Sequence, residues 1–118
     1  MIHPLFDLTG KTALVTGGSK GLGKAMARGF AETGADVLIS SRHEEELKSA
    51  AEEISDGLDV VVEWMVADMV DRSQVKALAE EAVKRLGKVD ILVNNAGSNA
   101  PQAIDEITDE AWDRIVEL

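Results

Sequence analysis

The sequence predicts an α/β domain with a doubly wound parallel sheet in the strand order 3-2-1-4. Short, apolar, β-branched segments alternate with amphipathic helical segments, and a glycine-rich turn joins the first such pair. The chain has 118 residues, 45% of them hydrophobic, which is enough for one domain but not two. We therefore expect one domain, whose sheet lacks the later strands of the complete fold.

The first strand is expected over Thr12–Thr16, which is apolar on both faces as buried parallel strands are. In the helix that follows, large apolar residues recur one turn apart, and we expect them to be buried: Leu22, Met26 and Phe30. Gly34 is expected to end this helix, and Asp36–Ser40 to form the second strand.

The second helix has an acidic face, interpreted as solvated, and an apolar face made of Leu47, Ala50, Ala51 and Ile54. The third strand is expected over Val60–Val66. Asp71 and Gln74 then have the spacing of a capping pair at the start of a third helix. Apolar residues recur along that helix with a period of about 3.6 residues: Val75, Leu78, Ala79, Ala82, Val83 and Leu86.

Gly87 is expected to end the third helix, and Val89–Val93 to form the fourth strand. Thr108 is a typical N-cap residue and predicts a fourth helix that still continues at Leu118. Because each pair of strands is joined through a helix, the crossovers are right-handed and the strands parallel.

The composition excludes several classes of function. A formal net charge of −10 repels phosphate backbones, so nucleic-acid binding is not expected. The absence of cysteine excludes disulfides, thiolate nucleophiles and cysteine-ligated metals, and it fits a cytoplasmic protein. Apolar runs reach about four residues, far short of the ~20 that span a bilayer. We see no signal peptide and expect no membrane partner.

The turn between the first strand and the first helix is rich in glycine. Gly17, Gly21 and Gly23 let the chain turn sharply and let its backbone approach a pyrophosphate. The start of the next helix offers N–H groups and a positive dipole end to such phosphates, although a plain structural turn is the alternative. We assign the turn to dinucleotide binding, through Gly17, Ser19, Lys20, Gly21, Leu22 and Gly23.

The same stretch also resembles the triphosphate-binding loop G-x-x-x-x-G-K-[ST], with Gly18, Gly23 and Lys24 in place. The last position is Ala25, which has no hydroxyl to ligate magnesium. The pattern fails at the group that holds the metal, so neither a triphosphatase nor a metal site is predicted.

Four motifs together resemble the short-chain dehydrogenase/reductase family, which has a Rossmann-type fold. Thr16–Gly23 has that family's spacing, Thr-Gly-x-x-x-Gly-x-Gly, and Lys11–Thr16 is similar to its opening. Asp68 follows the third strand and Asn94–Gly97 the fourth, as in the family. The resemblance covers the chain from about Phe6 onward, and is closest to 3-oxoacyl-carrier-protein reductases and gluconate dehydrogenase-like members.

The resemblance implies a dinucleotide cofactor, and the residues favour NADP(H) over NAD(H). NAD-binding folds place an acid near the end of the second strand to bond the ribose 2′-hydroxyl, whereas here Ser41 and Arg42 follow that strand. Arg42 suits a 2′-phosphate, and Lys20 in the glycine turn adds a second cation. Both positions are basic in NADP-dependent members of the family. The alternatives are a surface arginine at a helix start and a loop lysine exposed to solvent.

The resemblance also assigns the adenosine end. Asp68 is expected to accept a hydrogen bond from the adenine amino group beside the Met69 amide, or else to be only a turn residue at a helix entry. Three residues after the fourth strand are expected to line the ribose and its edge: Asn94, Ala96 and Gly97. The alternative there is a strand-end turn that ties down the sheet, a role that Asn95 partly has in the family.

No residue of this chain matches the family's catalytic groups. Members transfer hydride between the nicotinamide and a carbonyl or alcohol, using a tyrosine, a lysine, a serine and an asparagine, and this chain has no tyrosine. We therefore expect residues 1–118 to be the dinucleotide-binding N-terminal part of a longer enzyme, with a small carbonyl or alcohol substrate. The family implies a homodimer or homotetramer. The alternative is a non-catalytic, stand-alone dinucleotide-binding or interaction module.

Overall fold

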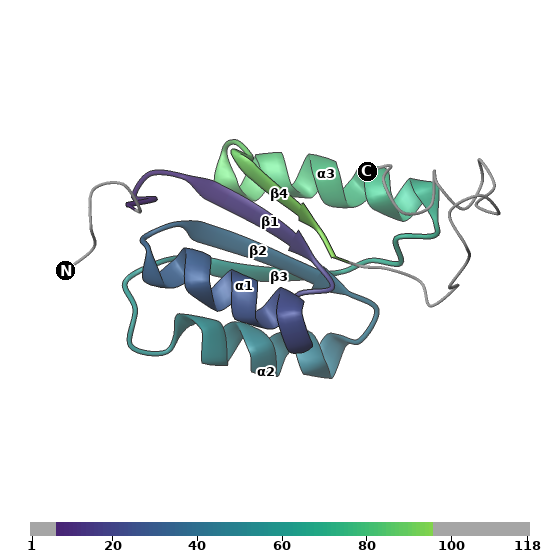
Figure 1. The fold of residues 1–118 in the computed structure, drawn as a ribbon. Coiled ribbons are helices and arrows are strands. Elements are labelled where there is room, and N and C mark those ends of the chain that lie inside the picture. The colour runs from purple at the N-terminus through teal and green to yellow at the C-terminus, as the bar shows by residue number, and fades with distance from the viewer. Residues whose placement is uncertain (1–6, 96–118) are drawn as a thin grey trace, which may run out of the picture.

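The computed structural model describes residues 7–95, which form a four-stranded parallel sheet with helices on both faces (Figure 1). The elements are β1 (Thr12–Thr16), α1 (Gly21–Glu32), β2 (Asp36–Ser41), α2 (Glu44–Ser55), β3 (Val62–Val66), α3 (Arg72–Leu86) and β4 (Ile91–Asn94). The strand order is β3-β2-β1-β4, which confirms the predicted doubly wound fold. The helix expected after Thr108 lies outside the described residues.

Two strands start later than predicted. β3 begins at Val62 rather than Val60, because the N–H of Val61 donates to the Asp36 carboxylate (2.9 Å) and not to a strand partner. β4 begins at Ile91 rather than Val89 and continues to Asn94. Just before β4, the Asp90 carboxylate accepts from the N–H of Thr12 (3.0 Å), so a side chain satisfies the first backbone N–H of β1 there.

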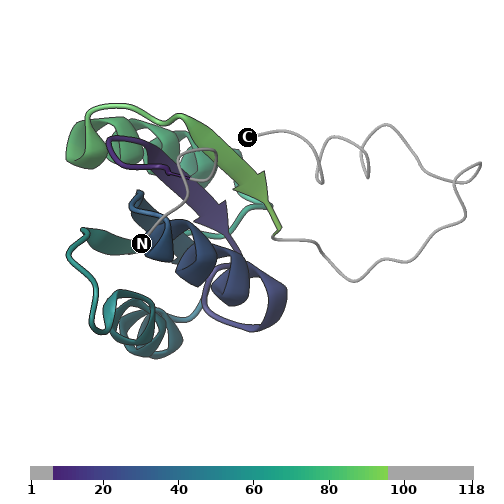
Figure 2. The same ribbon diagram turned by 60° about the vertical axis from the view of Figure 1, so that its left-hand side comes forward.

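The helices divide between the two faces of the sheet. α1 and α2 cover one face and α3 the other, as both views show (Figure 1, Figure 2). Val15 and Ile39 pack on the side of α1 and α2, while Leu14 and Leu38 pack on the side of α3. All of β1 is buried, as expected for a central parallel strand.

The buried face of α1 differs from the prediction. The residues that meet the core are Gly23, Ala27 and Ala31, and Leu22 is 68% exposed. The small residues let the helix lie close to the sheet and to α2, so the large side chains sit beside the contact and Phe30 is only partly buried. On α3, Val83 is likewise exposed, while Val75, Leu78 and Ala82 are buried as expected.

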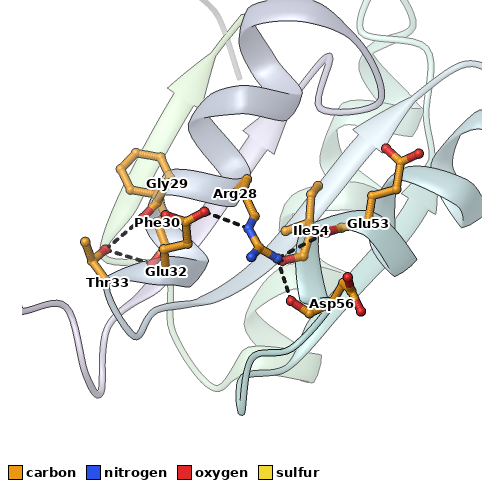
Figure 3. Close-up of polar contacts among 8 residues, drawn as sticks. All are labelled: Arg28, Gly29, Phe30, Glu32, Thr33, Glu53, Ile54 and Asp56. Atoms are coloured by element: carbon orange, nitrogen blue, oxygen red, sulfur yellow. Dashed lines mark hydrogen bonds and ion pairs between the residues drawn. The ribbon is translucent and has the colours of Figure 1, made fainter. Parts of the chain in front are cut away.

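Arg28 joins α1 to the end of α2 (Figure 3). Its Nη1 donates to the carbonyl oxygens of Glu53 (3.2 Å), Ile54 (2.9 Å) and Asp56 (2.8 Å), and its Nε donates to Glu32 on its own helix (2.7 Å). The last turn of α2 contains no basic residue. Arg28 therefore satisfies the carbonyl groups at that end and places a positive charge at the negative end of the helix dipole.

Candidate functional site

The segments predicted to bind a cofactor meet at the carboxyl edge of the sheet. Because the strands are parallel and in register, Thr16 lies beside Ser40 on one side and Asn94 on the other, and Ser41 lies beside Val66. The glycine turn, the start of α2 and the loop before α3 all leave from this edge. Ligands of doubly wound sheets bind at this edge, so the predicted site residues share one region.

The glycine turn is fixed by β2. The N–H groups of Gly17 and Gly18 both donate to the carbonyl oxygen of Ser40, at 2.7 and 3.2 Å. Gly17 and Gly21 have positive φ angles of 67° and 53°, which favour glycine. A Cβ on Gly18 would lie 2.7 Å from the side chain of Ile39. Gly18 is thus a structural requirement that motif reasoning missed, since its cause is a contact with another strand.

Gly23 is required by a close approach within the same turn. A Cβ there would fall on the carbonyl oxygen of Gly17 and lie 2.6 Å from Nδ2 of Asn95. The backbone N–H of Asn95 donates to Oγ1 of Thr16 (3.0 Å), and its Nδ2 donates to the Gly17 carbonyl oxygen (3.4 Å). Asn95 therefore ties the end of β4 to the glycine turn, the role that the resemblance implied.

The first turn of α1 is open at its N-terminus. Its N-cap is Lys20, whose side chain makes no capping bond, and the turn has no acidic residue. Within the described chain, the first helical backbone bond here is from the N–H of Lys24 to the carbonyl oxygen of Lys20 (3.2 Å). The N–H groups of the preceding positions have no helical acceptor, so this end suits an anion.

The side chain of Lys20 already has an anionic partner. Its Nζ lies 2.8 Å from Oε1 of Glu46, in the first turn of α2. The hydrogen bond from Lys20 lowers the pKa of Glu46 below its ordinary value. Sequence reasoning did not single out Glu46, although the strand register places the glycine turn next to the start of α2.

Arg42 follows β2 as predicted, whereas Ser41 is the last residue of β2, one residue beyond the predicted end of that strand. Arg42 is exposed, and its side chain makes no hydrogen bond or ion pair within residues 7–95. The Ser41 hydroxyl accepts from the N–H of His43 (3.2 Å) and so shapes the entry to α2. The Lys20–Glu46 pair links the glycine turn to the first turn of α2, the helix that Arg42 and His43 precede in the chain.

Asp68 is held by a local network before α3. Its Oδ1 accepts from the N–H of Val70 (3.0 Å), and its own N–H donates to Oε1 of Gln74 (2.8 Å). The Nε2 of Gln74 donates to Oδ2 of Asp71 (3.1 Å), which fixes the orientation of the amide. The predicted capping pair is confirmed with one difference, because Gln74 bonds the N–H of Asp68 and not that of the N-cap. Met69 packs against the core under α3.

Asn94 ends β4, with its Oδ1 3.3 Å from Oγ1 of Thr16. Ala96 and Gly97, also predicted to line the cofactor, lie outside the described residues. No cluster of three or more metal-ligating side chains occurs between residues 7 and 95. None of the helices in that range is long and apolar enough to cross a membrane.

Comparison with known proteins agrees with this geometry. The family model described as short chain dehydrogenase matches residues 11–118. A Mycobacterium tuberculosis protein named as a hydroxy-methyl-oxo-hexahydro-indene-carboxyl-CoA reductase is 41% identical over 98% of this chain and 44% of its own. A 3-oxoacyl-[acyl-carrier-protein] reductase of Thermotoga maritima is 36% identical over 94% of this chain and 45% of its own.

A solved structure gives the same result. L-sorbose reductase from Gluconobacter frateurii, complexed with NADPH and L-sorbose, superposes with a TM-score of 0.77 and is 36% identical. The match covers 92% of this chain and 41% of that one. The chain thus spans less than half the length of these relatives.

Proposed function

This chain belongs to the short-chain dehydrogenase family, and from that premise we propose that it binds NADP(H) for an oxidoreductase acting on a carbonyl or alcohol. The residues proposed to hold the cofactor are Gly17, Ser19, Lys20, Gly21, Leu22, Gly23, Ser41, Arg42, Asp68, Met69, Asn94, Ala96 and Gly97. When bound, the nicotinamide supplies or accepts the hydride.

The shape of the edge fits a dinucleotide. At Gly18 and Gly23 there is no room for a Cβ, because it would meet Ile39 or the carbonyl oxygen of Gly17, so glycine keeps the turn packed against β2 and the start of α1. The uncapped N–H groups of that helix bind and orient phosphate oxygens. Asp68 has one carboxylate oxygen on the N–H of Val70, which restrains the side chain, and its other oxygen is the one proposed to accept from the adenine amino group.

The preference for NADP(H) rests on one observation. Two cations, Lys20 and Arg42, lie in the segments that follow the neighbouring strands β1 and β2. The ion pair between Lys20 and Glu46 joins the glycine turn after β1 to the start of α2 after β2. A 2′-phosphate carries more negative charge than a 2′-hydroxyl and gains from both cations. The NADPH in the sorbose reductase structure adds support from a relative.

The test is a titration of the full-length enzyme with NADPH and NADH. We expect NADPH to bind at least about tenfold more tightly. Arg42→Met should weaken NADPH several-fold and leave NADH unchanged, and Lys20→Met should do the same to a smaller extent. Lys48→Met removes an exposed α2 cation outside the proposed cofactor-binding residues and serves as the matched control. Tighter binding of NADH by the unmodified enzyme would overturn the proposal.

We further propose that residues 1–118 are the cofactor-binding N-terminal part of a longer, cytoplasmic, homo-oligomeric enzyme. Support comes from the relatives, of which the chain covers 44% and 45%, and from the absence of the tyrosine that the family uses as proton donor. The proton donor then lies beyond these residues. Turnover of a carbonyl substrate by the isolated 118-residue chain would contradict this division.

A further inference from the structure

One acidic side chain lies at the corner assigned to the 2′-phosphate. Glu46 is in the first turn of α2, and its Oε1 is 2.8 Å from Nζ of Lys20. We propose that Glu46 is a specificity-determining residue that competes with the 2′-phosphate for Lys20 and so weakens NADP(H) binding relative to NAD(H). This inference rests on the proposed function, because it requires the 2′-position of the cofactor to lie at Lys20.

The two partners depend on each other. Glu46 is the one carboxylate within ion-pair distance of Lys20 in the described part of the chain. The second oxygen of Glu46, Oε2, is covered and has no hydrogen-bond donor there. Oε2 is covered although the side chain as a whole is 35% exposed, so the carboxylate loses its one ion-pair partner in the described chain if Lys20 leaves. Moving Lys20 onto a phosphate therefore costs free energy, because it breaks the ion pair with Glu46.

The charges at this corner act in the same direction. The hydrogen bond from Lys20 lowers the pKa of Glu46, so the Glu46 carboxylate is ionised at neutral pH. An ionised carboxylate beside the dianionic 2′-phosphate is repulsive, whereas a neutral 2′-hydroxyl is not repelled. Arg42 differs from Lys20, since it has no partner within residues 7–95 that a phosphate would have to displace.

The neighbouring residue provides a matched control. Glu45 is in the same helical turn and carries the same charge, but its side chain is 89% exposed, compared with 35% for Glu46. Its nearest cation is Lys48, at 4.0 Å, on the same helix. Glu45→Gln therefore makes the same change in net charge without touching Lys20.

The experiment measures dissociation constants of the full-length enzyme for NADPH and NADH, and for adenosine 2′,5′-bisphosphate and 5′-AMP. We expect Glu46→Gln to tighten NADPH and the bisphosphate by about three- to fivefold. NADH and 5′-AMP should change less than about 1.5-fold, and Glu45→Gln should leave all four within that range. Glu46→Ala, which removes the covered oxygen altogether, should act in the same direction.

The outcomes separate this inference from the proposed function. Unchanged or weaker NADPH binding by both Glu46 variants, with Lys20→Met still weakening NADPH, would overturn the inference alone. Weaker binding would mean instead that Glu46 orients Lys20 for the phosphate. If the unmodified enzyme prefers NADH and neither Lys20→Met nor Arg42→Met affects NADPH, the proposed cofactor is wrong and the inference falls with it.

Discussion

The helices α1 and α3 both start at the carboxyl edge of the sheet, but their first turns are completed in opposite ways. At α3, the Asp71 carboxylate accepts from the N–H groups of Ser73 (2.9 Å) and Gln74 (3.4 Å). At α1, Lys20 occupies the N-cap and makes no side-chain capping bond. One helix end is capped by its own chain, while the other has no capping side chain.

The difference separates the rigid loop before α3 from the turn before α1 that is proposed to bind the cofactor. The capped end of α3 belongs to a network that also fixes Asp68 through Gln74, so side chains hold that loop in position. The open end of α1 is shaped by glycines, which fit where a Cβ would meet Ile39 or the carbonyl oxygen of Gly17, and no side chain caps the helix there. Side-chain bonds position one loop, and packed glycine backbone shapes the other, which is the loop proposed to bind the cofactor.

The largest effect is expected from filling the α1 turn. Gly23→Ala places a methyl group on the carbonyl oxygen of Gly17, so the turn must open. We expect a loss of about 3 kcal/mol in the free energy of unfolding, measured with urea, and at least about tenfold weaker NADPH binding. Gly29→Ala, on the same helix with nothing within 4 Å, should instead raise stability by up to about 1 kcal/mol. Similar losses for the two variants would mean that close approach is not what requires Gly23.

A smaller effect is expected from opening the α3 end. Asp71→Ala removes the acceptor of two backbone N–H groups and the partner of Gln74, leaving α3 uncapped as α1 is. The midpoint of thermal unfolding should fall by about 5 °C. Asp59→Ala, an exposed loop aspartate with no bond in the described chain, should shift the midpoint by less than about 1 °C. Equal midpoints for Asp71→Ala and the unmodified protein would remove the contrast between the helix ends.

The smallest effect is a dependence of stability on pH at the α3 end. The bond from the Ser73 hydroxyl lowers the pKa of Asp71 below its ordinary value of 3.8. A lowered pKa adds stability that is present above 3.8 and lost as the pH falls through the folded-state value. Asp71→Asn keeps a capping oxygen but does not titrate, so the stability difference between the two proteins should shrink below about pH 4. A difference that stays constant from pH 7 to pH 3 would show that the charge of Asp71 has no role.

Local signals were enough to predict most of the fold. β1 has the bounds that its β-branched run predicts, and Gly87 ends α3 with a φ of 82°. The pairing of Asp71 with Gln74 was also readable, because both partners lie within one helical turn.

The features that could not be predicted depend on contacts between distant segments. Arg28 bonds carbonyl groups 25 to 28 residues away, and Lys20 meets Glu46 across two strand ends. Leu22 was assigned to the wrong face because apolar spacing does not show that small residues would make the close contact. In each case the deciding quantity is the distance between elements, which a single sequence does not contain.

The two bonds from Gly17 and Gly18 to the carbonyl oxygen of Ser40 have a kinetic consequence. They set the path of the turn during folding, so under the proposed function the cofactor meets a turn whose backbone is already held in place. Little conformational entropy remains to be lost on binding, and association is governed by the rate of encounter and not by a slow search of the loop. Through the Ser40 carbonyl oxygen alone, β2 thus contributes to the rate at which the proposed site would fill, without a side chain in the turn.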